Sequence, residues 1–304
     1  MAMLHNRAAR ADPPVLVIYH GNCDDGMGAA LAVKLADDMK SMHPAFVAGK
    51  YHEPIAPELA SGAYVIFVDF AYKRHVMKEI CARAHGVMVL DHHKSAMEDL
   101  AGLDREMPNL VLRFDMSRSG AVLAWEHFHP AKPVPLFYQY LQARDLWQLD
   151  SMPFVRDFSN ALRSYPQTMD WWVNYLDDEA VKDMIREGKS ISRFVDAKIV
   201  QMHDHRFAAT VGGAATVLVN CPYWGASDMA DYILRRQPTL SFAGAFFHLN
   251  AHTIQFSLRS RGEFDVARLA EGFGGGGHKQ AAGFTYTLSP QCDLLRIDFP
   301  EPDL

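Results

Sequence analysis

The segment VMVLDHHKSAM (87–97) places three side chains that can bind a metal ion, Asp91, His92 and His93, directly after a run of apolar residues. A short apolar run bounded by polar residues is typical of a buried strand. The three side chains therefore belong either to a solvated loop or to a functional site at the end of that strand.

Similar residues follow other apolar runs of the chain. Four strand-like runs lead into acidic residues or histidines: His20, Asp24 and Asp25; Asp69; the Asp91 cluster; and Asp115. In open parallel sheets, ligands bind at the carboxyl ends of the strands. One acidic residue there means little, because Asp often caps a following helix. Four such ends favour a shared metal site, and mixed carboxylate and imidazole suits Mn²⁺, Fe²⁺ or Zn²⁺ better than Mg²⁺ or Ca²⁺.

A glycine run lies near the end of the chain, in GFGGGGHKQAAGF (272–284). Consecutive glycines can aim backbone N–H groups at an anion, and HKQAA is expected to begin a helix whose positive end faces the same anion. The other reading is a flexible connection, since glycines also cluster in turns. The candidate substrate contacts are Arg259, which offers a planar fork for phosphate, and Gly275, Gly276, Gly277 and His278.

Five segments in this order, YHGNCDDG, FVDF, LDHHKS, ARDLW and GGGGHKQAAG, resemble the successive motifs of the DHH family of phosphoesterases and its associated C-terminal domain. The resemblance extends from residue 15 to residue 284. The DHH triplet alone is a weak signal, but the glycine–histidine motif downstream makes the match specific. The resemblance implies hydrolysis of phosphate esters with two Mn²⁺ ions, for which Mg²⁺, Co²⁺ or Zn²⁺ are substitutes.

The resemblance also implies roles for individual residues. The implied metal ligands are His20, Asp24, Asp25, Asp69, His92 and Asp145. His93 is implied to face the substrate phosphate, and Asp91 is a second catalytic candidate that we expect to orient the imidazole of His92. Asp69, central in the predicted sheet, is expected to bridge the two ions.

The first motif departs from the family pattern. The commoner motif separates its two aspartates by one residue, whereas Asp24 and Asp25 are adjacent here and Cys23 stands at the position of the earlier aspartate. This alignment favours Asp25 over Asp24 as a ligand and leaves open whether Cys23 contacts a metal.

The elements that must position these residues follow from hydrophobic periodicity. Short strands alternate with helices over the first 130 residues, which predicts an α/β fold with a doubly wound, mostly parallel sheet. The predicted strands are 15–19, 45–51, 63–70, 86–90 and 110–114, and the predicted helices are 28–39, 73–84, 94–100 and 119–128. We expect a DHH metal-binding catalytic domain at 1–150, a helical connector at 151–209, and a smaller α/β C-terminal domain with the GGGGH motif at 210–304.

Composition excludes several classes of protein. No apolar run is long enough to span a membrane. The four cysteines form no CxxC pair and the N-terminus lacks a secretory pattern, so we expect a cytoplasmic protein. The net charge of −6 disfavours binding along a long nucleic-acid duplex, which relies on many basic contacts to phosphates.

The sequence therefore predicts a manganese-dependent phosphodiesterase that uses two-metal hydroxide attack on short substrates. Short oligoribonucleotides, linear dinucleotides and nucleotide bisphosphates all fit. The alternatives are a pyrophosphate or polyphosphate phosphatase and a non-catalytic phosphate-binding regulatory protein. The substrate, the direction of cleavage and the oligomeric state stay open.

Overall fold

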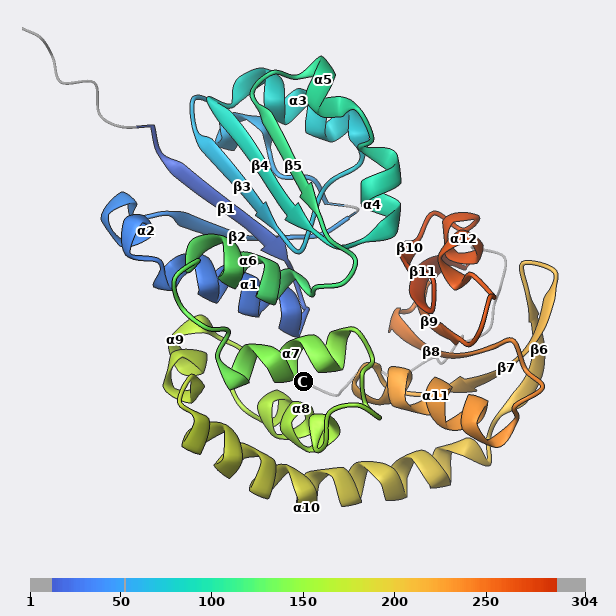
Figure 1. Cartoon of the computed structure of the whole chain (residues 1–304). Coiled ribbons are helices and arrows are strands. Elements are labelled where there is room, and N and C mark those ends of the chain that lie inside the picture. The colour runs from blue at the N-terminus through green and yellow to red at the C-terminus, as the bar shows by residue number, and fades with distance from the viewer. Residues whose placement is uncertain (1–12, 52, 289–304) are drawn as a thin grey trace, which may run out of the picture. The chain divides into compact units, whose positions relative to one another are not determined.

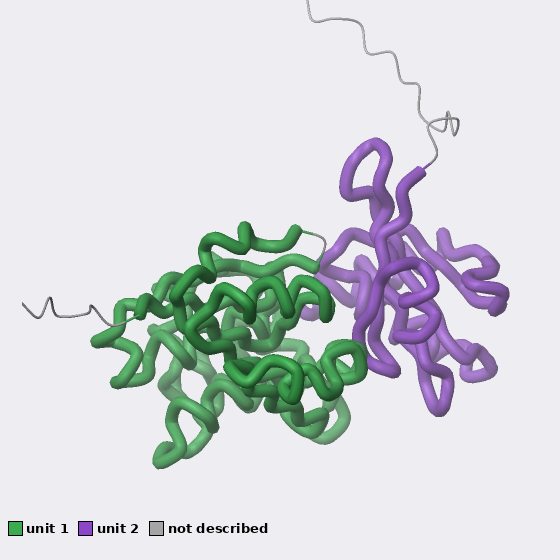
Figure 2. The backbone as a smooth tube through the Cα atoms, turned by 90° about the horizontal axis from the view of Figure 1, so that it is seen from above, with its two compact units in different colours: residues 1–191 green, residues 192–304 purple. Residues whose placement is uncertain are grey.

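A computed structural model describes residues 13–51 and 53–288. The N-terminal segment that lacks a secretory pattern, and Cys292, lie outside the described residues. The chain divides into two compact units, residues 1–191 and 192–304, which Figure 2 colours separately. The division falls within helix α10 (Asp178–His203). The domain boundaries expected near residues 150 and 209 stay predictions.

A five-stranded parallel sheet forms the centre of the first unit (Figure 1). Its strand order is β2-β1-β3-β4-β5, with bounds β1 (Val15–His20), β2 (Ala45–Gly49), β3 (Tyr64–Val68), β4 (Gly86–Asp91) and β5 (Leu110–Phe114). Separate hydrophobic clusters involve alternate residues of the strands, such as Val17 in one and Ile18 in the other. Because side chains alternate along a strand, the two clusters lie on opposite faces of the sheet. The predicted doubly wound sheet is confirmed.

Helices connect these strands. Their bounds are α1 (Asp24–Leu35), α2 (Asp37–Met42), α3 (Arg74–Arg83), α4 (Lys94–Asp99), α5 (Leu103–Glu106) and α6 (Gly120–Phe128), with a 3₁₀ turn η1 (Pro57–Ala60). The predicted single helix at 28–39 is wrong, because α1 begins at Asp24 and the chain is extended at Ala36. Acidic side chains in a first helical turn are favourable, which explains why α1 includes Asp24 and Asp25.

A helical segment follows the sheet. It contains α7 (Leu136–Asp145), α8 (Val155–Ser164), α9 (Met169–Trp172), a 3₁₀ turn η2 (Val173–Tyr175) and α10. Phe137, Phe158 and Trp172 of these helices are fully buried in the same cluster as Val17 of β1. This packing fixes α7, and with it Asp145 at the end of that helix, against the sheet.

The second unit holds a six-stranded sheet in the order β10-β11-β9-β8-β7-β6. Its elements are β6 (Phe207–Val211), β7 (Ala214–Asn220), η3 (Tyr223–Gly225), α11 (Ala226–Arg236), β8 (Phe242–Asn250), β9 (Thr253–Ser260), α12 (Val266–Glu271), β10 (Gly276–His278) and β11 (Ala281–Thr287). The smaller α/β domain is thus confirmed. The helix expected from HKQAA is wrong, because β10 and β11 form an antiparallel hairpin there and β11 also pairs with β9.

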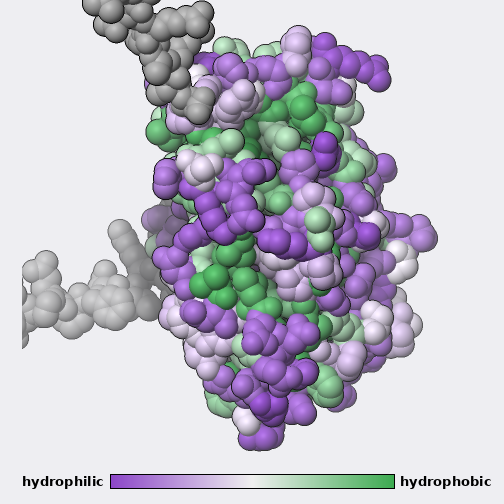
Figure 3. Space-filling view, turned by 60° about the vertical axis from the view of Figure 1, so that its left-hand side comes forward, coloured by the Kyte–Doolittle hydropathy of each residue, from purple (hydrophilic) through white to green (hydrophobic). Residues whose placement is uncertain are grey.

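No helix among the described residues is long and apolar enough to cross a membrane. The face in Figure 3 carries hydrophilic side chains with smaller hydrophobic areas between them.

Candidate metal centre

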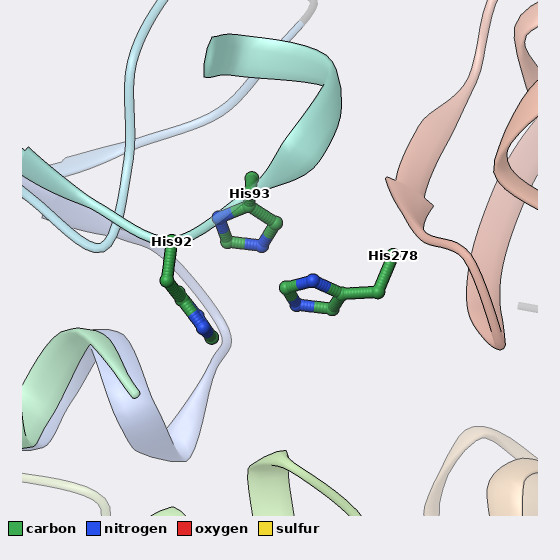
Figure 4. A group of neighbouring side chains, drawn as sticks. All are labelled: His92, His93 and His278. Atoms are coloured by element: carbon green, nitrogen blue, oxygen red, sulfur yellow. The ribbon is translucent and has the colours of Figure 1, made fainter. Parts of the chain in front are cut away.

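Three adjacent strands deliver polar side chains to one edge of the first sheet. β1 ends at His20, Asp69 follows β3, and β4 ends at Asp91. Because β1, β3 and β4 pair in parallel, their carboxyl ends meet. His92 and His93 continue from β4 toward α4, as Figure 4 shows.

His92 lies where three carboxylates converge. Its Nε2 atom lies 3.0 Å from Asp69 Oδ1, 3.5 Å from Asp145 Oδ2 and 3.6 Å from Asp25 Oδ2. His92, Asp25 and Asp69 are at most 2% exposed, and the Asp145 side chain is partly buried. The structure thus gathers residues that are far apart in the sequence around one imidazole nitrogen.

The two oxygens of Asp69 face different neighbours. Oδ1 faces His92, whereas Oδ2 lies 3.4 Å from His20 Nδ1. Asp69 has a left-handed backbone with φ of 56°, a conformation that costs a residue other than glycine about 1–3 kcal/mol. A Cβ on Gly120 would lie only 2.3 Å from the Asp69 Cβ, so glycine is required at position 120. The Asp69 carboxylate is thus held in place by a strained backbone and by close packing of Gly120 against its side chain.

Asp25 is held by the start of helix α6. The backbone N–H groups of Gly120 and Ala121 donate to its two carboxylate oxygens at 2.5 and 3.2 Å. The positive end of a helix stabilises an anion at this position. Gly120 therefore donates a hydrogen bond to Asp25 and leaves room for Asp69. The sequence does not predict this role, because a single glycine after a serine is not a recognisable motif.

Asp24 lies apart from this cluster. Its Oδ2 atom accepts a hydrogen bond of 2.6 Å from Arg163 Nε on helix α8. Among the described residues, the groups of side chains that bring metal-ligating atoms within 4.8 Å of one another include Asp25 but not Asp24. The adjacent aspartates thus have different partners.

Asp91 organises the two histidines that follow it. Its Oδ1 atom accepts hydrogen bonds from the backbone N–H groups of His92 and His93, at 2.7 and 3.3 Å. The same oxygen lies 2.7 Å from His93 Nδ1. Asp91 therefore orients the ring of His93, whereas the sequence reading expected it to orient the ring of His92. This contact places the proton of a neutral His93 on Nδ1 and leaves Nε2 as its other functional atom.

Charge in the cluster is unbalanced. Burial raises the pKa of Asp25 well above its usual range, and the charges of Asp69 and Asp145 raise it further. Burial also raises the pKa of Asp145, although His92 opposes that shift. Burial acts in the same direction on Asp69, but the neighbouring imidazoles of His20 and His92 hold its pKa well below the usual range. Despite burial, the carboxylates raise the pKa of His92. Such shifts indicate an excess of negative charge around His92.

The donor set fits a divalent cation. Asp69 Oδ2 and Asp145 Oδ2 are buried oxygens that accept no hydrogen bond within the part of the chain described here. Ligand atoms lie within 4.8 Å of one another in one group of His20, Cys23 and Asp69, and in another of Asp25, His92 and Asp145. Buried carboxylates and imidazoles of this kind bind Mn²⁺, Fe²⁺, Co²⁺ or Zn²⁺.

The predicted substrate contacts lie in the second unit. Arg259 on β9 donates from Nη2 to Ser227 Oγ at 2.6 Å and from Nη1 to the Leu258 carbonyl oxygen at 2.8 Å. His278 is the last residue of β10, from which its side chain projects in Figure 4. Their role in substrate binding stays a prediction.

The glycine run has a structural reason of its own. A Cβ on Gly275 would lie 2.1 Å from the Gly283 carbonyl oxygen, and one on Gly277 would lie 2.5 Å from that of Ala281. Gly277 also has φ of 141°, which L side chains rarely adopt. Gly276 begins β10 between them. These glycines permit close backbone packing in the hairpin, and their contact with an anion stays a prediction.

Comparison with known proteins identifies a domain in the second unit. Residues 224–296 match the model of the DHHA1 domain, and the DHH triplet of the first unit lies at the end of β4, within the cluster just described. The chain carries a DHHA1 domain in its second unit.

Individual proteins also resemble this chain. The uncharacterized protein R106 of Acanthamoeba polyphaga mimivirus is 29% identical over 308 residues, covering 94% of this chain and 71% of R106. The pGpG-specific phosphodiesterase PggH from Vibrio cholerae is 15% identical with a TM-score of 0.45, covering 90% of this chain and 93% of PggH. RecJ from Thermus thermophilus, in complex with Mn²⁺, is 17% identical with a TM-score of 0.46, covering 90% of this chain and 49% of RecJ.

Proposed function

We propose that this chain is a DHH-type, manganese-dependent phosphodiesterase that hydrolyses short nucleotide substrates. Short oligoribonucleotides, linear dinucleotides and nucleotide bisphosphates are the substrate classes. The observation that carries the proposal is the position of Asp69, whose Oδ1 faces His92 and whose Oδ2 faces His20. A carboxylate placed in this way can serve two cations at once, which is the arrangement of two-metal hydrolases.

The first cation would be held by His20 and Asp69, and the second by Asp69, Asp25, His92 and Asp145. Asp25 is proposed in preference to Asp24, because Asp24 pairs with Arg163. When bound, the ions supply Lewis acidity and lower the pKa of water. Mn²⁺ is the proposed ion, and Mg²⁺, Co²⁺ or Zn²⁺ are substitutes.

The remaining residues bind and orient the substrate. His93 Nε2 would contact a phosphate oxygen, while Asp91 holds the ring through Nδ1 at 2.7 Å. His93 is only 8% exposed, so its ring has little freedom to turn away. Arg259, the glycines at 275–277 and His278 are proposed to bind the phosphate or nucleotide. Short substrates are favoured because the net charge of −6 opposes binding to a long polyanion.

A substrate panel tests the proposal with the full chain in Mn²⁺. The panel holds 5′-labelled RNA dimers to decamers, linear dinucleotides, nucleotide bisphosphates, pyrophosphate and bis-p-nitrophenyl phosphate. We expect turnover of the generic diester and of the shortest nucleotides, lost with EDTA and restored by Mn²⁺. Turnover of pyrophosphate alone would identify a phosphatase instead. Bound metal without turnover of any ester would identify a phosphate-binding protein.

A further inference from the structure

Cys23 differs from the other described cysteines in its surroundings. Cys81 lies in the hydrophobic core of the first unit, and Cys221 is fully buried in the second. Cys23 is only partly exposed, yet it belongs to neither core cluster of the first unit. A free cysteine usually behaves as a small apolar residue inside a core. That explanation applies to Cys81 and does not apply to Cys23.

Capping of helix α1 does not explain Cys23 either. It occupies the N-cap position, where Ser, Thr, Asp and Asn are preferred because their side chains accept hydrogen bonds from the helix. The Cys23 side chain makes no capping hydrogen bond, whereas its backbone carbonyl oxygen accepts from Met27 N–H at 3.0 Å. Capping therefore does not account for a cysteine at this position.

The local backbone holds Cys23 beside His20. Asn22 has a left-handed φ of 57°, and the neighbouring Gly21 N–H donates to the Gly49 carbonyl oxygen at 2.9 Å. A Cβ on Gly26 would lie 2.3 Å from the His20 carbonyl oxygen, so the first turn of α1 packs directly on the end of β1. The tight connection fixes the position of the residue between them.

The sulfur completes a group of three ligand atoms. Those of His20, Cys23 and Asp69 lie within 4.8 Å of one another. Asp25, His92 and Asp145 form another group that supplies three metal ligands. His20 and Asp69 supply only two metal ligands unless the Cys23 sulfur is the third. Asp69 Oδ2 is buried and accepts no hydrogen bond in the described part of the chain, so it is available to a cation on the His20 side.

We propose that Cys23 Sγ is the third protein ligand of the metal site formed by His20 and Asp69. The inference rests on the proposed two-metal function and makes the two sites chemically different. The Cys23 site offers nitrogen, oxygen and sulfur, and the other site offers nitrogen and oxygen alone. Thiolate ligands select softer ions, so the Cys23 site favours Zn²⁺, Co²⁺ or Fe²⁺ over Mg²⁺.

Cobalt spectroscopy on the full chain tests this inference independently of turnover. A thiolate bound to Co²⁺ gives an intense charge-transfer band in the near ultraviolet, which carboxylates and imidazoles do not give. We expect the wild-type chain to show this band with two Co²⁺ ions bound. Cys23→Ser should lose it, and the matched control Cys81→Ala should keep it.

A second variant separates ligand loss from unfolding. Cys23→Asp supplies a carboxylate in place of the sulfur, so it should keep two Co²⁺ ions, lose the band and shift its preference from Zn²⁺ toward Mn²⁺. Two bound Co²⁺ ions without the band in wild type would overturn the role of Cys23 and leave the metal centre intact. Persistence of the band in Cys23→Ser would also overturn it. Failure of the wild type to bind any Co²⁺ would instead defeat the proposed metal centre itself.

Discussion

Replacing Asp69 by asparagine removes one charge from the centre of the cluster and changes little else. Asparagine has nearly the same shape and tolerates the left-handed backbone that Asp69 adopts, with φ of 56°. Asp69 is 1% exposed and its oxygens lie 3.0 and 3.4 Å from His92 and His20. At about 3 Å and an effective dielectric constant of about 20, one unit-charge interaction amounts to about 5 kcal/mol.

Loss of this interaction should reduce turnover by about 10³-fold or more, because each 1.36 kcal/mol corresponds to about tenfold. The assay is hydrolysis of bis-p-nitrophenyl phosphate in Mn²⁺, with bound manganese measured on the same samples and folding checked by circular dichroism. Asp115→Asn is the matched control, since Asp115 also follows a strand of this sheet but bonds to Ser117 instead. Asp69→Asn protein that folds and keeps more than about a tenth of wild-type turnover would refute the bridging role.

Four further outcomes are expected. Asp25→Asn should lower turnover far more than Asp24→Asn, because Asp25 faces His92 whereas Asp24 pairs with Arg163, and equal losses in the same assay would contradict this. Gly120→Ala should destabilise the chain by about 1–3 kcal/mol through overpacking and lower bound manganese, as thermal melts and metal analysis would detect. Gly102→Ala, where a Cβ has space but φ is 76°, should also destabilise the chain and leave bound manganese unchanged. Mn²⁺ binding near neutral pH should release protons and become tighter as pH rises, because His92, whose pKa is raised in the folded protein, must lose its proton to bind the metal. Calorimetry in two buffers of different ionisation enthalpy measures the number of protons released. Arg259→Ala should raise KM for short oligonucleotides by a factor that corresponds to about 1.5–3 kcal/mol of lost binding energy, with little effect on the small diester. An equal effect on both substrates would contradict a nucleotide-binding role for Arg259 that is separate from the catalytic centre.

The sequence allowed good prediction of the sheet and of its ligand-bearing end. Apolar runs of strand length alternate with helical periodicity, and parallel strands bring their carboxyl ends together, so His20, Asp69 and Asp91 were expected at one edge. Asp145 had no local signal, because it ends helix α7 and only the family resemblance pointed to it.

The remaining details depend on contacts between distant residues. Arg163, whose contact separates the roles of Asp24 and Asp25, is 139 positions away from Asp24. The ring that Asp91 orients depends on how the chain turns after β4, which composition does not reveal. Lys, Gln and Ala in HKQAA have good helix propensity, but pairing of β11 with β9 determines their conformation instead.

Anomalous diffraction from crystals of the full chain grown with Mn²⁺ tests the central claim most directly. The claim is that Asp69 serves two cations, one beside His20 and one beside His92. We predict two manganese peaks about 3.5–4 Å apart, with the Asp69 carboxylate between them. A single peak, or peaks that Asp69 does not contact, would contradict the account.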